Sequence, residues 1–359
     1  MTGCGITRHF VPALVAALAL AAFGAVSGCG YDDSGTDIGG EGSGDGGADA
    51  GGDTVADADA DADAAGDAGP GPTLGGCPMF PPDNPWNTPI DDAPLHERSA
   101  AFIESMGGAT ALHPDFGTEW EGAPIGIPYT LVPASQPLVD VVFDYADESE
   151  PGPYPIPLDA LIEGGPDADG DRHILLLQTG SCTLYEIFSA YPPGAAGEPW
   201  TAGSGAIWHL DRNEVRPDGW TSADAAGLAI LPGLVRYDEA VEQGEIRHAI
   251  RITVNGAQRA YIYPATHSDG RGGSDPDAPP MGLRPRLRAD FDMSGFSAPV
   301  QVILRAMQRY GVMVADTGTN WYVTGVPDTR WNDDMLVSEL RRVLGSDFEA
   351  VYTGEPHPY

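Results

Sequence analysis

A predicted β-strand at residues 246–254 carries a histidine on one face and two arginines, Arg247 and Arg251, on the other. Side chains alternate between the faces of a strand, so His248 shares the apolar face, whereas Arg251 lies on the other. A histidine on such a face is either a core residue with both ring nitrogens hydrogen-bonded or a site residue facing a cleft. His248 is therefore a candidate catalytic base, with a structural role as the alternative.

A second predicted strand, residues 183–191, places Glu186 on a face that it shares with apolar side chains. A buried carboxylate must be paired, hydrogen-bonded or have its pKa raised. A raised pKa is what a general acid needs near neutral pH. Glu186 is thus a candidate acid beside His248 at a solvent-filled hollow, and pairing with Arg251 is the structural alternative.

Aspartates alternate in the segment from Asp167 to His173, which joins two predicted strands. The sixth place from Asp167 is Arg172, where a calcium-binding loop of the EF-hand type needs glycine. A solvated turn is therefore favoured over a calcium site. Asp171 remains a candidate catalytic carboxylate, and His173 a possible partner of Glu186.

Two further loops combine small and polar residues. In residues 219–227 a hydroxyl and the carboxylate of Asp224 lie two residues apart, which suits a helix cap or a cleft floor, and the G-x-S-x-G motif of serine hydrolases does not occur. In residues 261–269 a predicted strand ends near His267, a candidate for acid–base chemistry or metal binding. A merely exposed loop histidine is the alternative. The sequence has no H-E-x-x-H motif and no spaced cysteine quartet, so neither a zinc site nor a cofactor is expected.

Aromatic residues in loops could stack on sugar rings, although such residues also close protein cores. The candidates for binding substrate are Trp208, Trp220 and Tyr263, together with Arg251 for an acidic sugar.

Short segments rich in β-branched and aromatic residues dominate the middle of the chain. They follow one another without intervening helices, which favours antiparallel pairing. The predicted fold is mainly β, an antiparallel sandwich or barrel-like domain with a few helices and an α+β C-terminal segment. The predicted strands are residues 138–145, 173–178, 183–191, 205–210, 246–254, 260–263 and 320–324.

Three helices are predicted from apolar spacing and from end signals, at residues 99–106, 297–311 and 333–345. In the second, Ser297 is the expected N-cap and Gly311 the stop. Residues 312–326 between the last two helices are expected to form a hairpin.

An apolar run at residues 10–26 is typical of a signal peptide, assigned here to residues 1–28. The run ends in Val26-Ser27-Gly28-Cys29, which resembles the lipobox of bacterial lipoproteins. The resemblance implies that Cys29 becomes the lipidated first residue of an exported protein, anchored to the bacterial cell envelope at the outer membrane or cell surface. A plain secretory signal is the alternative.

Residues 29–76 consist almost entirely of Gly, Ala, Asp, Ser and Thr, which predicts a disordered acidic tether before a single globular domain at residues 77–359. The net charge of −35, with 53 acids against 18 arginines and no lysine, excludes a protein that binds nucleic-acid backbones. Cys77 and Cys182 remain as an even pair in an oxidising compartment, which predicts a disulfide.

These features favour a surface-tethered enzyme that degrades an extracellular glycan, either a glycoside hydrolase or a polysaccharide lyase. In hydrolysis Glu186 is the acid, with Asp224 or Asp171 as base or nucleophile. In elimination His248 or His267 removes the proton of a uronate that Arg251 neutralises. The alternatives are a non-catalytic glycan-binding or adhesion lipoprotein and a structural surface protein.

Overall fold

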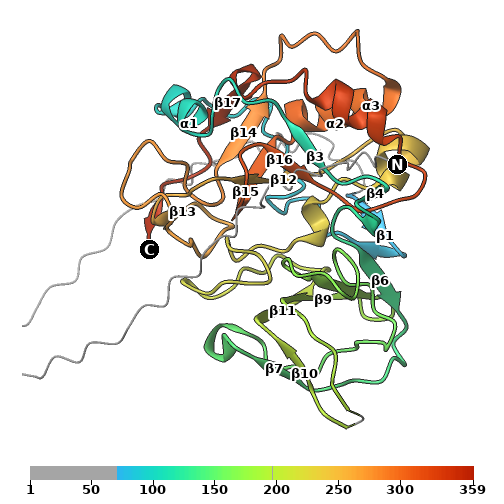
Figure 1. Ribbon diagram of the computed structural model, residues 1–359. Coiled ribbons are helices and arrows are strands. Elements are labelled where there is room, and N and C mark those ends of the chain that lie inside the picture. The colour runs from blue at the N-terminus through green and yellow to red at the C-terminus, as the bar shows by residue number, and fades with distance from the viewer. Residues whose placement is uncertain (1–70, 196) are drawn as a thin grey trace, which may run out of the picture. The chain divides into compact units, whose positions relative to one another are not determined.

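The computed structural model describes residues 71–195 and 197–359, which belong to one compact unit, Ala62–Tyr359 (Figure 1). The predicted signal peptide, Cys29 and most of the predicted tether lie outside the described residues. Strand β1 (Thr73–Leu74) pairs antiparallel with β2 (Cys77–Pro78). The last residues assigned to the tether therefore belong to the folded part.

The first large sheet has the strand order β11-β9-β8-β6, comprising β11 (Ser204–His209), β9 (Thr183–Phe188), β8 (Ile174–Gln178) and β6 (Tyr129–Val132). In β8, Leu175 and Leu177 join the main core, whereas Ile174 and Leu176 join a smaller core on the opposite face. Since both faces of β8 are covered, its sequence is an uninterrupted apolar run rather than an alternating one.

The second large sheet has the order β15-β12-β16-β3, comprising β15 (Val312–Thr317), β12 (Ile250–Val254), β16 (Tyr322–Thr324) and β3 (His113–Asp115). All five residues of β12 are buried, which suits a central strand. The predicted hairpin at residues 312–326 is wrong, because β12 lies between β15 and β16 and pairs with both.

Four two-stranded pairs complete the β-structure besides β1 and β2. They are β7 (Val141–Phe143) with β10 (Trp200–Ala202), β4 (Glu119–Trp120) with β5 (Ala123–Pro124), β13 (Ala260–Tyr261) with β18 (His357–Pro358), and β14 (Arg284–Leu287) with β17 (Phe348–Val351).

The prediction of a mainly-β fold with a few helices is confirmed. The expectation of antiparallel pairing holds only in part, because β6 with β8, β7 with β10, β12 with β15 and β3 with β16 are parallel. Long connections between these partners make parallel pairing possible, and the connection from β12 to β15 includes a helix, Ala298–Arg309, directly before β15. Among residues 71–195 and 197–359, no sheet closes into a barrel.

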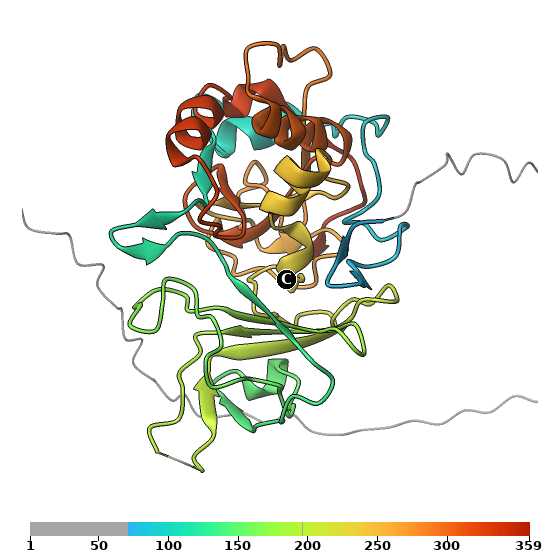
Figure 2. The same ribbon diagram turned by 90° about the vertical axis from the view of Figure 1, so that its right-hand side faces the viewer.

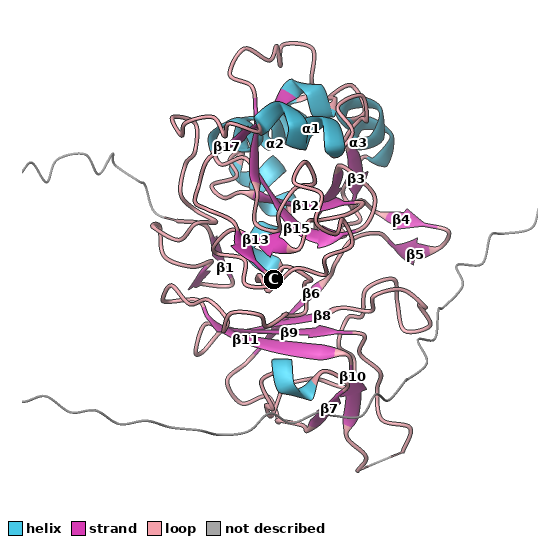
Figure 3. Cartoon of the chain, turned by 90° about the vertical axis from the view of Figure 1, so that its left-hand side faces the viewer, coloured by secondary structure: helices cyan, strands magenta, loops and turns pink. Residues whose placement is uncertain are grey.

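The three predicted α-helices are confirmed as α1 (Ser99–Ser105), α2 (Ala298–Arg309) and α3 (Asp333–Leu340). They lie on the side of the β12 sheet that faces away from the β9 sheet (Figures 1, 2 and 3). Helix α2 buries its predicted apolar stripe. Ser297 does not cap α2 with its side chain but donates from Oγ to Glu339 at 2.9 Å. None of the described helices is long and apolar enough to cross a membrane.

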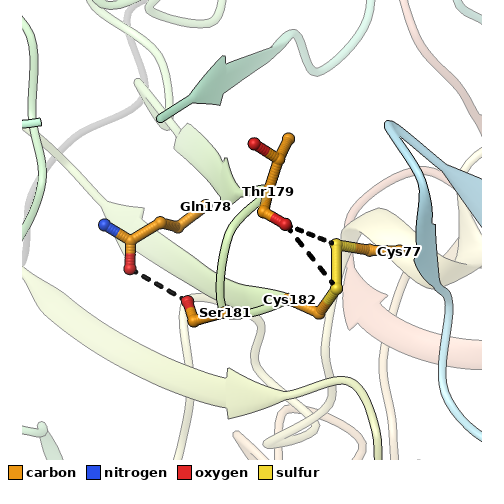
Figure 4. Close-up of a disulfide and its surroundings, with 5 residues drawn as sticks. All are labelled: Cys77, Gln178, Thr179, Ser181 and Cys182. Atoms are coloured by element: carbon orange, nitrogen blue, oxygen red, sulfur yellow. Dashed lines mark hydrogen bonds between the residues drawn. A yellow bond between two sulfur atoms is a disulfide. The ribbon is translucent and has the colours of Figure 1, made fainter. Parts of the chain in front are cut away.

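The predicted disulfide between Cys77 and Cys182 is present, with the two Cα atoms 5.3 Å apart (Figure 4). It joins the N-terminal hairpin to the turn between β8 and β9. Beside it, Ser181 Oγ donates to Gln178 Oε1 at 3.0 Å. The bond thus ties the start of the folded part to the first large sheet.

Candidate active site

A cavity of about 350 Å³ lies where β15, β9 and β11 meet loops from elsewhere in the chain. Asp316 and Thr317 end β15, Phe188 ends β9, and Ser204 begins β11. The loops supply most of the ionisable groups. The lining carboxyl groups belong to Glu148, Asp171, Asp224, Asp269 and Asp316, beside His267 and Arg271.

Arg251 of β12 organises the floor of this cavity. Its Nε and Nη2 atoms donate to the two carboxylate oxygens of Asp224, at 2.9 and 2.8 Å, and Nη2 also donates to Asp316 at 2.7 Å. Two oxygens bound to one nitrogen at 2.8 and 2.7 Å can be no farther apart than the sum of these distances, 5.5 Å. One buried guanidinium therefore serves two carboxyl groups that lie close together.

The two carboxyl groups differ in their access to solvent. The Asp224 side chain is fully buried, whereas the Asp316 side chain keeps 20% of its surface exposed. Burial and the charge of Asp224 together raise the pKa of Asp316 to about 7, because the opposing effect of Arg251 is smaller. Asp316 thus carries a proton part of the time at neutral pH and can present it to the cavity.

His173 forms a buried ion pair behind the cavity. Its Nδ1 atom lies 2.6 Å from Glu163 Oε2, and its Nε2 atom lies 2.9 Å from the carbonyl oxygen of Ala223. Burial alone lowers the pKa of His173, but the Glu163 carboxylate outweighs it and raises the pKa to about 9. The ring is therefore a cation with both nitrogens donating, and it positions the backbone next to Asp224. The predicted partner, Glu186, is replaced by Glu163.

Glu186 lies outside this cavity, in the core. Its carboxylate accepts hydrogen bonds from the backbone N–H groups of Ile230 and Leu231, each at 2.9 Å, and from Trp208 Nε1 at 3.1 Å. Burial raises its pKa to about 7, yet its side chain is fully enclosed. Trp208 is buried with it and is a core residue here. Glu186 thus holds the segment that starts the short helix Leu231–Gly233.

His248 is also sealed in the core, in the segment before β12 begins at Ile250. Its Nε2 atom lies 3.2 Å from Glu239 Oε2, and its Nδ1 atom lies 2.8 Å from the carbonyl oxygen of Ala249. The structure therefore does not assemble Glu186 and His248 as one acid–base pair, because each is satisfied by partners of its own.

Three other predicted residues do reach the cavity. Asp224 forms its floor, Asp171 is exposed at its edge, and His267 lines it from the opposite loop. The Nδ1 atom of His267 donates to the carbonyl oxygen of Ala225 at 2.6 Å, which fixes the orientation of the ring.

The remaining predicted binding residues lie in different settings. Arg251 forms ion pairs with Asp224 and Asp316, not with Glu186. Trp220 is half-buried, with the Arg216 guanidinium 5.5 Å from its ring centroid. Tyr263 is 41% exposed and donates from its hydroxyl to Asp218 at 2.6 Å.

The sequence did not single out Asp316, which lines the cavity, or Asp115 and Glu163, which lie outside its lining. Asp316 is the first polar residue after the apolar run of β15, and Asp115 likewise ends β3. A carboxylate directly after a buried strand is a usable signal for both. Burial, followed by the charge of Glu163, raises the pKa of Asp115. Glu163 itself lies in an irregular loop and has no comparable signal.

Within the described part of the chain, no group of three or more His, Cys, Asp or Glu side chains is arranged to hold a metal ion. Comparison of the chain with models of protein families, with curated proteins and with solved structures finds no match.

Proposed function

We propose that the protein is a surface-tethered extracytoplasmic lipoprotein that hydrolyses glycosidic bonds in an extracellular polysaccharide. The observation that carries the proposal is the Asp316 carboxyl, which has a pKa of about 7 and reaches a cavity that also presents further carboxylates. A proton donor poised near neutral pH beside ionised carboxylates is the arrangement that glycosidic hydrolysis requires.

In this mechanism Asp316 donates its proton to the glycosidic oxygen, and the bond to the anomeric carbon breaks with its electron pair moving to that oxygen. Water attacks the anomeric carbon and passes a proton to Asp171. Asp224 lies close enough to Asp316 for the spacing of a retaining pair, roughly 5 Å, but it is fully buried and cannot attack. Its role is a fixed negative charge facing the developing positive sugar ring. Inversion at the anomeric carbon is the expected stereochemistry.

The charge of the cavity favours hydrolysis over elimination. A lyase needs a cation to neutralise its uronate, but Arg251 is occupied by two carboxylates and Arg271 pairs with Asp269 at 3.1 Å. The surplus of carboxyl groups repels an anionic sugar. A neutral or amino-sugar polysaccharide is therefore the proposed substrate class.

The second candidate is a non-catalytic glycan-binding or adhesion lipoprotein. It is favoured by the exposed aromatic side chains of Tyr263 and Tyr359, of which Tyr359 contacts the cavity residue His267. In that case the raised pKa of Asp316 has no role in turnover, and substitution of Asp316 leaves glycan binding intact.

Export and anchoring are proposed from the sequence. The lipobox-like motif ending in Cys29 and the acidic segment that follows it support a lipid anchor in the bacterial cell envelope, with the folded part held away from the membrane.

The test is to incubate the full chain with neutral, amino-sugar and uronate polysaccharides and to measure new reducing ends and unsaturated-uronate absorbance. We expect reducing ends without unsaturated products. Asp316→Asn is expected to lower kcat by at least about 100-fold, since the amide cannot donate an acidic proton. Wild-type activity is expected to fall as pH rises through 7, because Asp316 then loses its proton.

The matched control is Asp92→Asn, which changes an exposed aspartate away from the cavity lining and is expected to leave kcat unchanged. Unsaturated products, or an Asp316→Asn variant with wild-type kcat and pH profile, contradict the mechanism. Glycan binding without any product supports the second candidate.

A further inference from the structure

An aromatic face lies on the two-stranded ribbon of β13 and β18. Tyr261 is paired with His357 in the ribbon. The backbone N–H of Tyr359 donates to the carbonyl oxygen of Arg259 at 3.0 Å, which adds one more backbone hydrogen bond beyond the paired residues. Residues two apart along a strand share a face. This pairing places Tyr261 beside His357, and Tyr359 follows His357 by two residues. Tyr263 lies just beyond β13, with its ring against those of Tyr261 and His357. We call these four residues the aromatic face.

Three rings of the aromatic face, those of Tyr261, Tyr263 and His357, pack against one another. The rings of Tyr261 and His357 stack with their centroids 5.6 Å apart, and the Tyr263 ring meets the edge of His357 at 4.5 Å. Tyr261 is buried beneath, whereas Tyr263 and Tyr359 keep 41% and 51% of their surface exposed. The hydrogen bond from Tyr263 to Asp218 further restrains its ring. The exposed Tyr263 ring is thus held in place before any ligand binds.

The aromatic face adjoins the candidate active site. The Tyr359 ring lies edge-on to the ring of His267, with the centroids 4.5 Å apart, and His267 lines the cavity. Burial, followed by the charge of Glu148, raises the pKa of Tyr359, and Glu148 also lines the cavity. A chain molecule bound in the cavity can therefore continue onto these rings.

We propose that the aromatic face is a second sugar-binding subsite, which holds a unit of the same glycan chain beyond the one in the cavity. The inference rests on the proposed function and deepens it. Exposed tyrosine rings offer flat apolar surfaces with a polar edge, which suit the C–H face and hydroxyl groups of a sugar ring. The neighbouring carboxylates of Asp218, Glu148 and Asp269 make a sugar without negative charge the fitting occupant.

The subsite predicts that long chains are better substrates than short ones. The test compares KM and kcat of the full chain with those of Tyr263→Ala and Tyr359→Ala on oligosaccharides of increasing length. In both variants KM for the longest oligosaccharide is expected to rise on the order of 10-fold relative to the shortest, while kcat changes less. Affinity electrophoresis in gels containing the neutral polysaccharide measures binding independently of cleavage.

The matched control is Trp120→Ala, on strand β4. Trp120 is 70% exposed, and β4 lies apart from β13 in Figures 1 and 3. This variant is expected to keep the wild-type dependence on chain length. Circular dichroism verifies that each variant is folded, and Tyr263→Phe serves as the milder change if Tyr263→Ala is not.

The outcomes separate the subsite from the proposed function. Cleavage by the wild type with no length dependence, and with both tyrosine variants unaltered, overturns the subsite and leaves hydrolysis standing. Glycan binding that is lost in the tyrosine variants, with no product from the wild type, supports the subsite and overturns hydrolysis. Neither binding nor product from the wild type overturns both.

Discussion

Arg251 has more carboxylate neighbours than it can neutralise. It forms a bidentate pair with Asp224, which is the geometry in which a guanidinium binds a carboxylate most strongly. Asp316 receives only one hydrogen bond from the same group. Desolvation therefore outweighs the attraction of Arg251 at Asp316 and favours the neutral carboxyl group. The buried pair of Arg251 and Asp224 thus has a proton donor, Asp316, beside it.

His173 offers a test of the ion pair that supports the site. His173→Gln is expected to lower the free energy of unfolding by about 3–5 kcal/mol, because it leaves Glu163 without its buried partner. The folded-state pKa of His173, about 9, lies above the ordinary value of 6.5, so its contribution is complete below pH 6.5 and is lost as pH rises through 9. The pKa of Glu163 is lowered, so its contribution is lost as pH falls below the ordinary value of 4.5.

Urea denaturation between pH 5 and pH 10 measures this effect, with the difference between variant and wild type expected to shrink as pH rises from 6.5 to about 9 and then to stay level. His209→Gln, at a half-exposed histidine of β11, is the control and is expected to change stability little. A His173→Gln deficit that does not vary with pH contradicts a charged His173.

At the scale of elements, the alternation of side chains predicts the face of a residue only where a strand forms. Within β12 the alternation of side chains puts Arg251 on the face opposite to that of its neighbours Ile250 and Ile252, as predicted. The strand begins at Ile250, however, so His248 precedes it. Its burial with a partner at each ring nitrogen fits the structural alternative. The segment before β12 bends to the first residues of the fold, where the N–H of Ala249 donates to the carbonyl oxygen of Trp86 at 2.7 Å.

Gly311 joins α2 to β15 and is predicted to be intolerant of a side chain. Its φ is +72°, and an added Cβ would lie 2.5 Å from Ile90 Cδ1 and 2.6 Å from the Pro285 carbonyl oxygen. Gly311→Ala is expected to destabilise the fold by more than the roughly 1–2 kcal/mol that a left-handed backbone alone costs. Chemical denaturation measures the loss.

Gly244 is a matched control, because it has the same φ of +72° but nothing within 4 Å of an added Cβ. Gly244→Ala is expected to show the backbone cost alone. Equal losses in the two variants would show that the close contacts at Gly311 relax without penalty.

At the scale of the whole molecule, the disulfide closes a loop between residues 105 positions apart in the sequence. Removing it with the double substitution Cys77→Ala and Cys182→Ala is expected to lower the free energy of unfolding by about 4–5 kcal/mol, because the unfolded chain regains the entropy of a large loop. Guanidinium denaturation of the variant and of the oxidised and reduced wild type measures the change. A loss below about 1 kcal/mol contradicts this contribution.

The sequence by itself was enough for properties that depend on neighbouring residues. The helices, most strand positions and the mainly-β class follow from local periodicity, and the disulfide followed from there being two cysteines left in the folded part. Asp171, Asp224 and His267, which the sequence offered as candidate catalytic residues, all line the cavity, because polar groups in loops between strands tend to meet at sheet ends.

Only the tertiary structure decided which charges share a partner. Arg251 meets Asp224 and Asp316 across 27 and 65 positions of sequence, and β12 had to insert between β15 and β16 for these contacts to form. A charge on a strand is attracted to any opposite charge, so its type and spacing leave the partner undetermined. The strand order brings particular side chains within hydrogen-bonding distance, and burial then determines which carboxyl keeps its proton.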